Sequence, residues 1–226
     1  MITPHQAMGL SSAHLVEVTG GHFLQGTVKS AFEQMQKAAL RQKIDVQICS
    51  SFRSFERQLS IWNRKWKGEL PLYRLNGEKL NANTLSDEEK IHAIMLWSAL
   101  PGASRHHWGT DFDVYDKANV EALQHDFQLI PQEYEGSGPC AKLSSWLTTY
   151  AKDFGFSFPY AEYIGGVAKE PWHLSHTESA SAIETQFSTE RLANTLSEST
   201  ICGKDTILEN LDNLVYRYTF NEGKKS

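Results

Sequence analysis

The sequence has no surplus of positive charge. Its 22 lysines and arginines stand against 27 aspartates and glutamates, which gives a formal net charge of −5. Only the pair Lys224–Lys225 hints at a basic tail. Proteins that bind nucleic acids present a basic stripe to the phosphates. We therefore expect no nucleic-acid partner.

Cysteine is scarce, and its spacing lacks the signatures of a metal site or a disulfide framework. The chain has three cysteines, Cys49, Cys140 and Cys202, which are far apart and odd in number. They form neither a C-x-x-C pair nor an even set. We expect reduced thiols, most of them buried, as is common for free cysteine.

Long apolar runs are absent as well. No segment approaches the roughly 20 apolar residues that a membrane-spanning helix needs. The first residues, Met1 to His5, lack the basic and then apolar order of a secretion signal. We expect no membrane insertion and a cytoplasmic protein; a periplasmic or secreted one would follow if a longer precursor had been trimmed.

The chain also lacks repeats and low-complexity linkers, and its 226 residues suit one domain. We predict a single domain over residues 1–226, with 193–226 a possible C-terminal extension, either a packed edge of the sheet or a lid. Apolar spacing, caps and turn signals predict the elements. Helices are expected over 27–42, 55–66, 87–100, 143–154 and 177–192, strands over 45–49, 111–115, 156–160, around 172 and over 215–220, and a hairpin over 72–80. This irregular mixture favours an α+β fold.

One polar cluster runs from Ser104 to Asp113. His106 and Asp113 are seven positions apart, and Gly109 between them permits the turn that would bring them together. Neutral imidazole nitrogen and carboxylate oxygen are both good zinc ligands. A solvated loop explains this cluster alone about equally well, because histidine pairs in loops are common.

A second cluster, Glu170-Pro171-Trp172-His173, supplies a third candidate ligand and a carboxylate close to it in sequence. In a regular strand Glu170 and His173 would face opposite sides, but Pro171 interrupts regular pairing. A buried tryptophan with two polar surface neighbours is the simpler interpretation of these four residues alone.

A third cluster spans Ser50 to Gln58 and places Arg53 at a strand-to-helix corner. The planar guanidinium could bind a substrate carboxylate or stabilise an oxyanion. Taken alone, Arg53 is also explained as a surface residue paired with Glu56 or Asp45.

Together these clusters resemble the zinc D-alanyl-D-alanine carboxypeptidases of the vancomycin-resistance type, with related dipeptidases and phage endolysins. The family pattern Ser-x-His-x-x-Gly-x-Ala-x-Asp is matched by Ser104, His106, Gly109 and Asp113. The later Glu-x-Trp-His is matched by Glu170, Trp172 and His173. An upstream Ser-x-aromatic-Arg-Ser-x-x-x-Gln element is matched by Ser50, Phe52, Arg53, Ser54 and Gln58. The resemblance spans roughly residues 27–176.

The resemblance implies one Zn²⁺ per chain, held by His106, Asp113 and His173, with Glu170 as general base. It implies that Arg53 polarises the scissile carbonyl or binds the substrate carboxylate, and that Ser104 and Gln58 contact the substrate. The resemblance further implies a small central antiparallel sheet flanked by helices, as in hedgehog-like and D,D-peptidase domains. It implies a peptidoglycan-derived peptide as substrate.

The chain departs from the family pattern at two places. Asp111 stands where the family has alanine, so it could be a partner of a ligand or a competing ligand. Leu174-Ser175-His176 replaces the aromatic, arginine and tyrosine of many relatives, which leaves the scissile bond open. The alternatives are an endolysin-type L-alanyl-D-glutamate endopeptidase, an L,D-carboxypeptidase and a metal-containing binding module without catalysis. The roles of His107 and His176 are also open.

Overall fold

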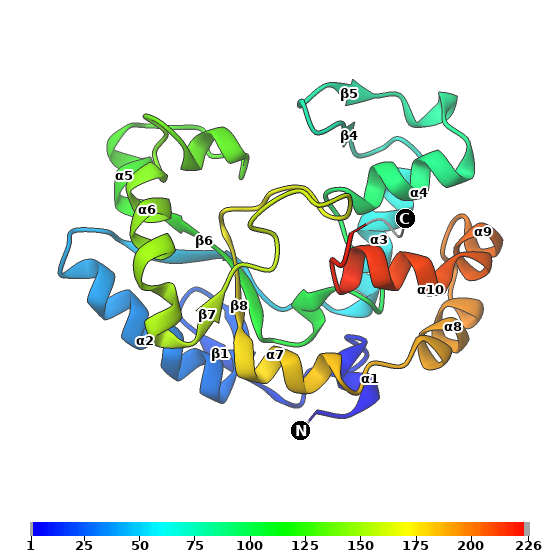
Figure 1. Ribbon diagram of the computed structural model, residues 1–226, viewed down its shortest axis with the longest axis horizontal. Coiled ribbons are helices and arrows are strands. Elements are labelled where there is room, and N and C mark those ends of the chain that lie inside the picture. The colour runs from blue at the N-terminus through cyan, green and yellow to red at the C-terminus, as the bar shows by residue number, and fades with distance from the viewer. Residues whose placement is uncertain (1, 224–226) are drawn as a thin grey trace.

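The computed structural model describes residues 2–223, so the pair Lys224–Lys225 lies outside the described range. Its centre is a four-stranded antiparallel sheet in the order β3-β6-β8-β7 (Figure 1). The strands are Val46–Ser50 (β3), Asp111–Asp116 (β6), His173–His176 (β8) and Phe156–Ser157 (β7). The predicted α+β fold with a small antiparallel sheet is confirmed.

The alternating side chains of β6 separate an apolar face of the sheet from a polar one. Phe112 and Val114 are fully buried in the main hydrophobic core. Because successive side chains of a strand point to opposite faces, Asp111 and Asp113 lie on the other side. The sheet therefore carries a packed core on one face and a group of carboxylates on the other.

Two helices supply most of the partners of the apolar face, α2 (Gly26–Leu40) and α6 (Ala141–Tyr150). Helix α2 buries the predicted stripe of Val28, Phe32, Met35 and Ala39. Helix α6 continues as a 3-10 helix, Ala151–Phe154, that ends at Gly155 with φ 82°, as the sequence predicts. The short helix α5 (Lys117–Ala122) follows β6 directly.

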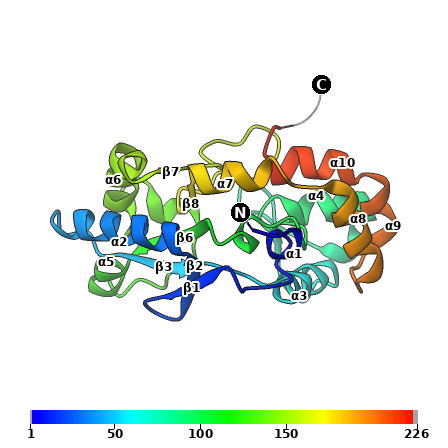
Figure 2. The same cartoon turned by 90° about the horizontal axis from the view of Figure 1, so that it is seen from below.

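A second hydrophobic core lies among the helices on the other side of the molecule (Figures 1 and 2). Helices α3 (Phe55–Trp66) and α4 (Asp87–Met95) pack there with the C-terminal helices. The latter are α8 (Thr189–Glu198), α9 (Lys204–Glu209) and α10 (Leu211–Leu214). Residues beyond 192 thus contribute buried side chains to this second core rather than an edge of the sheet.

Two hairpins and two short helices lie around these cores, together with the 3-10 helices Ala82–Thr84, Arg105–His107 and Pro131–Tyr134. β4 (Leu72–Tyr73) and β5 (Lys79–Leu80) form the predicted hairpin around Gly77, and they pair antiparallel. The hairpin of β1 (Leu15–Val18) and β2 (His22–Gln25) leads into α2 and was not predicted. Helices α1 (Pro4–Ala7) and α7 (Thr177–Glu184) contribute to a third, smaller cluster around Trp108.

The predicted strand over 215–220 is wrong. Val215–Thr219 is instead a π-helix that continues α10. The sequence Val-Tyr-Arg-Tyr-Thr-Phe alternates with period two, yet it also places Val215, Tyr218 and Thr219 at helical spacing. These three are the residues that the helix buries. Packing against the second core decides between the two periods.

Three other boundaries differ from the prediction. The helix expected over 177–192 is two helices, because Ser188 caps α8 with a hydrogen bond from Arg191 N. The Ser86 capping box is present, but α4 ends at Met95 rather than near Leu100. The strand expected over 156–160 is only Phe156–Ser157.

The expectation that most of the thiols are buried is wrong, because only one of the three is. All three cysteines are free, and Cys140 is buried while Cys49 and Cys202 are partly exposed. Within residues 2–223, no helix has both the length and the apolar character needed to cross a bilayer.

Candidate metal centre and active site

The central strand β6 brings Asp113 opposite His173. The two residues pair in register across β6 and β8, and Asp113 also pairs with Ser50 of β3. Their side chains share the polar face of the sheet, and His173 Nδ1 lies 3.0 Å from Asp113 Oδ1. The two residues are 60 positions apart in sequence, so only the strand pairing makes them neighbours.

His106 reaches the same place from a 3-10 helix, Arg105–His107, that precedes β6. The turn out of this helix needs Gly109, whose φ is +69° and where a Cβ would lie 2.2 Å from a side-chain atom of β1. His106 Nδ1 lies 3.0 Å from the Ser51 carbonyl oxygen. A carbonyl only accepts, so Nδ1 carries the hydrogen and the lone pair of Nε2 faces Asp113 Oδ2, 3.4 Å away.

His106, Asp113 and His173 fit a divalent metal ion. One ligand atom from each lies within 4.8 Å of the others, and all three residues are buried. Burial, together with Arg53, lowers the pKa of His106 to about 3, so its imidazole is neutral. Burial raises the pKa of Asp113, but His106 and His173 outweigh it and hold that pKa at about 2. A neutral imidazole and an ionised carboxylate are the forms that bind zinc.

Without a metal ion, His173 holds a proton that a cation would replace. Burial lowers its pKa, but hydrogen bonds to Asp111 and Asp113 outweigh burial and raise it to about 9. Metal binding at such a site releases the proton, because the ligand must be neutral. The negative charges of Asp111 and Asp113 therefore favour a positive charge here, which is either the protonated His173 or a bound metal ion.

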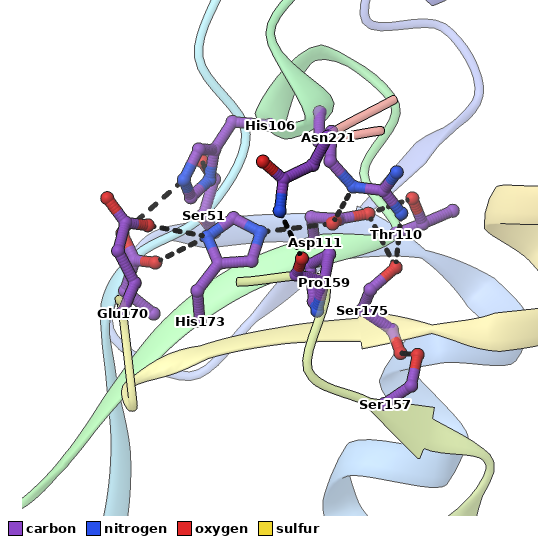
Figure 3. A network of polar contacts seen from close by, with 12 residues as sticks. Ser51, His106, Thr110, Asp111, Ser157, Pro159, Glu170, His173, Ser175 and Asn221 are labelled. Atoms are coloured by element: carbon purple, nitrogen blue, oxygen red, sulfur yellow. Dashed lines mark hydrogen bonds and ion pairs between the residues drawn. The ribbon is translucent and has the colours of Figure 1, made fainter. Parts of the chain in front are cut away.

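Glu170 lies beside this group, in the turn that precedes β8 (Figure 3). His173 N donates to the Glu170 carbonyl at 3.2 Å, and Glu170 N donates to the Tyr160 carbonyl at 2.9 Å. Because Glu170 stands before the strand begins, it is free of strand alternation, and its Oε2 lies 3.6 Å from His173 Nδ1. Burial raises the pKa of Glu170 to about 7, a value suited to taking and returning a proton near neutral pH.

Arg53 approaches the same group from the corner between β3 and α3. Its Nη2 lies 3.4 Å from Asp113 Oδ2, and its Nε and Nη2 donate to Ser50 Oγ at 3.2 and 2.8 Å. Gln58, which is fully buried, accepts from Arg53 Nη1 at 3.5 Å and donates to the Ala99 carbonyl at 2.7 Å. Ser50 and Gln58 thus hold the planar guanidinium with its edge toward the carboxylate.

Three residues whose roles the sequence leaves open have defined places. His107 is fixed by backbone: Nδ1 donates to the Arg53 carbonyl at 2.6 Å, and Nε2 accepts from Gly102 N at 3.0 Å. His176 caps α7, with Nδ1 2.9 Å from Ser179 Oγ. Asp111 lies on the far side of the His173 ring from Asp113, with Oδ1 3.0 Å from Nε2.

The three candidate ligands, Arg53 and Glu170 border one cavity of about 610 Å³. Its polar lining includes the three candidate ligands with Arg53, Ser104 and Glu170. The Ser104 hydroxyl is buried and has no hydrogen-bond partner among the described residues. An unpaired buried hydroxyl next to a cavity is a donor available to a ligand.

The remaining lining of the cavity is largely apolar. Tyr73 and Leu75 come from the β4–β5 hairpin, and Leu129 and Ile130 come from the segment that follows α5. Leu75 and Ile130 are 48% and 43% exposed. Such a cavity, apolar with a few convergent polar groups, is typical of small-molecule and peptide sites.

Two imidazoles, a carboxylate and a separate, largely buried carboxylate in one cavity are side chains typical of a metal-dependent hydrolase. The family model of VanY, D-alanyl-D-alanine carboxypeptidase, matches residues 21–179. Because this match covers more than half of the sequence, the chain belongs to the VanY family of D-alanyl-D-alanine carboxypeptidases.

The chain is also similar to two relatives in sequence and to solved structures in fold. Two uncharacterized proteins of Haemophilus influenzae are 42% identical over 103 residues and 34% identical over 121 residues. These matches cover 44% and 53% of this chain and 70% and 92% of the relatives. The fold is shared with VanYB in complex with D-alanine-D-alanine (TM-score 0.52, 21% identity, 80% of this chain and 88% of that one). It is also shared with a VanY D,D-pentapeptidase mutant in complex with Zn(II) (TM-score 0.51, 19% identity, 87% and 92%).

The structure brings together the residues that the sequence nominated: the three candidate ligands, Glu170, Arg53, Ser104 and, behind Arg53, Gln58. Sequence reasoning missed the apolar walls of the cavity and the part played by Arg105, which is buried beside Asp111. The turn signal at Asn76-Gly77 predicts a hairpin, but no local pattern predicts that it lies over the site.

Proposed function

We propose that this chain is a zinc-dependent carboxypeptidase that hydrolyses the peptide bond next to a D-amino acid in peptidoglycan-derived peptides, with D-alanyl-D-alanine ends as its main substrate. The observation that carries this proposal is the buried group of His106, Asp113 and His173 with Glu170 beside it, all on one cavity. Membership of the VanY family supports the substrate class.

In this proposal His106, Asp113 and His173 hold the zinc ion. When bound, zinc acts as a Lewis acid on the scissile carbonyl and lowers the pKa of water toward neutrality. Three protein ligands leave a coordination position open, which distinguishes a catalytic site from a structural one. The depressed pKa of His106 suits this role, because its lone pair is not occupied by a proton.

Glu170 is the general base and then the general acid. Its carboxylate takes a proton from the attacking water as the new C–O bond forms, and it returns that proton to the leaving nitrogen as the C–N bond breaks. The pKa of about 7 that burial gives Glu170 serves both halves of this exchange. The products are a shortened peptide with a new carboxylate and a free amino acid.

Arg53 binds the negative charge of the substrate in this proposal. Its Nη2 lies 3.4 Å from Asp113 Oδ2. Ser50 Oγ accepts from Nε and Nη2, and Gln58 accepts from Nη1 on the other edge of the guanidinium. A preorganised donor at a developing oxyanion typically contributes about 10²- to 10³-fold to the rate. Ser104, whose buried hydroxyl is unpaired, is proposed to donate to the bound peptide. Gln58 acts through Arg53, and its direct contact with substrate stays a prediction.

A digest of defined cell-wall peptides tests this proposal. The zinc-loaded full chain is incubated with peptides ending in D-Ala-D-Ala, with peptides ending in one D-Ala, and with peptides whose only candidate bond is L-Ala-D-Glu. Mass spectrometry should show release of one terminal D-alanine from the first. Cleavage of the second alone indicates an L,D-carboxypeptidase, and an internal cut indicates an endopeptidase. A zinc-loaded chain that cleaves none of them contradicts the enzymatic proposal and favours a binding module.

A further inference from the structure

His173 engages a carboxylate at each of its two ring nitrogens. Nδ1 faces the candidate metal group, 3.0 Å from Asp113 Oδ1 and 3.6 Å from Glu170 Oε2. Nε2 faces the other way and lies 3.0 Å from Asp111 Oδ1. Figure 3 shows Glu170 and Asp111 on opposite sides of the imidazole ring. Asp111 therefore contacts His173 without belonging to the three-residue donor group.

The Asp111 carboxylate is fully buried and fixed through both oxygens. Oδ1 accepts from Arg105 Nε at 2.7 Å in addition to its contact with His173. Oδ2 accepts from Thr110 Oγ1 at 2.6 Å and from Ser175 Oγ at 3.1 Å. Groups that donate at every contact favour the acceptor-only, ionised form of the carboxylate. With this many partners, Asp111 has no freedom to turn toward the metal group.

Arg105 compensates the buried charge and anchors Asp111 to the rest of the fold. Its guanidinium lies over the Trp108 ring, 4.7 Å from the centroid, and Nη2 donates to Ser175 Oγ at 2.8 Å. Its Nη1 pairs with Glu184 of α7. The ion pair with Glu184, the Trp108 ring and the Ser175 hydroxyl together fix Arg105. Arg105 in turn holds Asp111 beside Nε2 of His173.

We propose that Asp111 is a positioning residue, which accepts the Nε2 hydrogen of His173 and thereby presents the Nδ1 lone pair to the metal ion. The metal role of His173 comes from the proposed function, and this inference rests on it. A carboxylate behind a ligating histidine fixes the tautomer and the ring orientation and makes the ligand more basic. The family pattern has alanine at this position, so the chain adds a charged partner where the pattern has none.

The competing explanation is that Asp111 serves only to neutralise Arg105 inside the protein. That explanation predicts that a substitution of Asp111 destabilises the fold. Zinc affinity would then change only as far as the loss of stability changes it. Glu184 offers a matched control, because it pairs with the same Arg105, and within residues 2–223 no hydrogen bond or ion pair joins it to His173. Glu184→Gln disturbs the anchor alone, whereas Asp111→Asn removes the charge that faces Nε2 and keeps the shape.

The first experiment measures zinc affinity of the full chain by competition with a chelator. Partners of ligating histidines typically contribute about 10- to 100-fold in metal affinity. We expect Asp111→Asn to weaken zinc binding by that factor and Glu184→Gln to leave it within about twofold of the parent. Equal affinity of Asp111→Asn and the parent, or equal losses in both variants, overturns the proposal.

The second experiment uses the unchanged protein, so it does not depend on whether a variant folds. Nitrogen-15 NMR of the zinc-loaded chain reports which nitrogen of each imidazole carries hydrogen. We expect His173 to carry hydrogen at Nε2 and to bind zinc through Nδ1. Zinc at Nε2, or a hydrogen at Nδ1, overturns the proposal. Neither experiment uses peptide hydrolysis. If both expected results are obtained with a chain that cleaves no peptide, the proposed function is contradicted and the role of Asp111 stands.

Discussion

At the scale of single residues, the proposed catalysis depends on Glu170, which lies largely buried beside the three candidate ligands. Its Oε2 lies 3.6 Å from His173 Nδ1, and burial raises its pKa to about 7. A carboxylate in ordinary contact with water would hold protons too weakly to return one to the leaving amine. Burial beside the metal group therefore gives Glu170 its proposed chemistry.

Glu170→Gln should separate catalysis from metal binding. The amide keeps the shape of the side chain but accepts no proton, so we expect turnover to fall by at least about 10²- to 10⁴-fold, the usual contribution of a general base. Zinc content should stay at one ion per chain, because no proposed ligand changes. The measurement is the rate of D-alanine release with metal analysis of the same sample. Unchanged turnover contradicts the assignment of Glu170, and lost zinc moves it to the ligands.

Arg53→Lys tests the planar fork rather than the charge. The single nitrogen of a lysine cannot replace the three guanidinium nitrogens, of which Nε and Nη2 donate to Ser50 and Nη1 donates to Gln58. We expect kcat/KM to fall by roughly 10²-fold, with zinc content unchanged. Arg57→Lys, on the exposed side of α3, the helix that follows Arg53, is the control and should keep the parental rate. A near-normal rate for Arg53→Lys assigns Arg53 to a surface role.

At the scale of elements, the β4–β5 hairpin provides an apolar wall over a polar site. Leu75 of this hairpin lines the cavity although it is 48% exposed. Leu75→Asp should raise KM for the peptide several-fold with little change in kcat, because the wall touches the substrate at a distance from the reacting bond. Leu40→Asp is the matched control, since Leu40 is 61% exposed at the end of α2. Equal KM values for both variants indicate that the hairpin does not contact the peptide.

Local sequence signals predicted the elements whose apolar residues follow a single spacing. They failed where the apolar residues fit both the helical and the strand spacing. The stripe of α2 and the alternation of Asp111 to Tyr115 each have one interpretation, and the structure agrees with both. Val215–Thr219 satisfies two periods, so only its contacts with the second core select the helical one. The β1–β2 hairpin was missed because each strand buries one apolar residue, Val18 or Leu24, and exposes another, Val16 or Phe23, so no regular apolar alternation marks a buried face.

The candidate site was predictable because its residue types and order, not their contacts, carry the family resemblance. The sequence could propose that His106, Asp113 and His173 meet, but the reason lies in the register of β6 with β8. It could not place Asp111 behind His173, since the same face of β6 carries both aspartates. The turn at Glu170 likewise depends on the pairing of its N–H with Tyr160.

At the scale of the whole molecule, the cavity draws its lining from both sides of the fold. Met95 of α4 belongs to the second core, and Leu75 belongs to the β4–β5 hairpin. Asp113 and His173 belong to the sheet. The C-terminal helices α8 to α10 stabilise α3 and α4 through that second core. The geometry of the site should therefore depend on residues that never approach the substrate.

Leu196→Ala in α8 tests whether residues 193–226 are part of one cooperative unit. Leu196 is fully buried in the second core, and removing such a side chain typically costs about 2–5 kcal/mol. For a protein of this size each kcal/mol lowers Tm by about 2–4 °C. We expect a single thermal transition, followed by circular dichroism, that shifts down as a whole. Leu123→Ala, at a position that is 59% exposed, should leave Tm unchanged. If residues 193–226 were a separate extension, Leu196→Ala would instead give a second transition at a lower temperature. The zinc-dependent activity would then persist above that temperature.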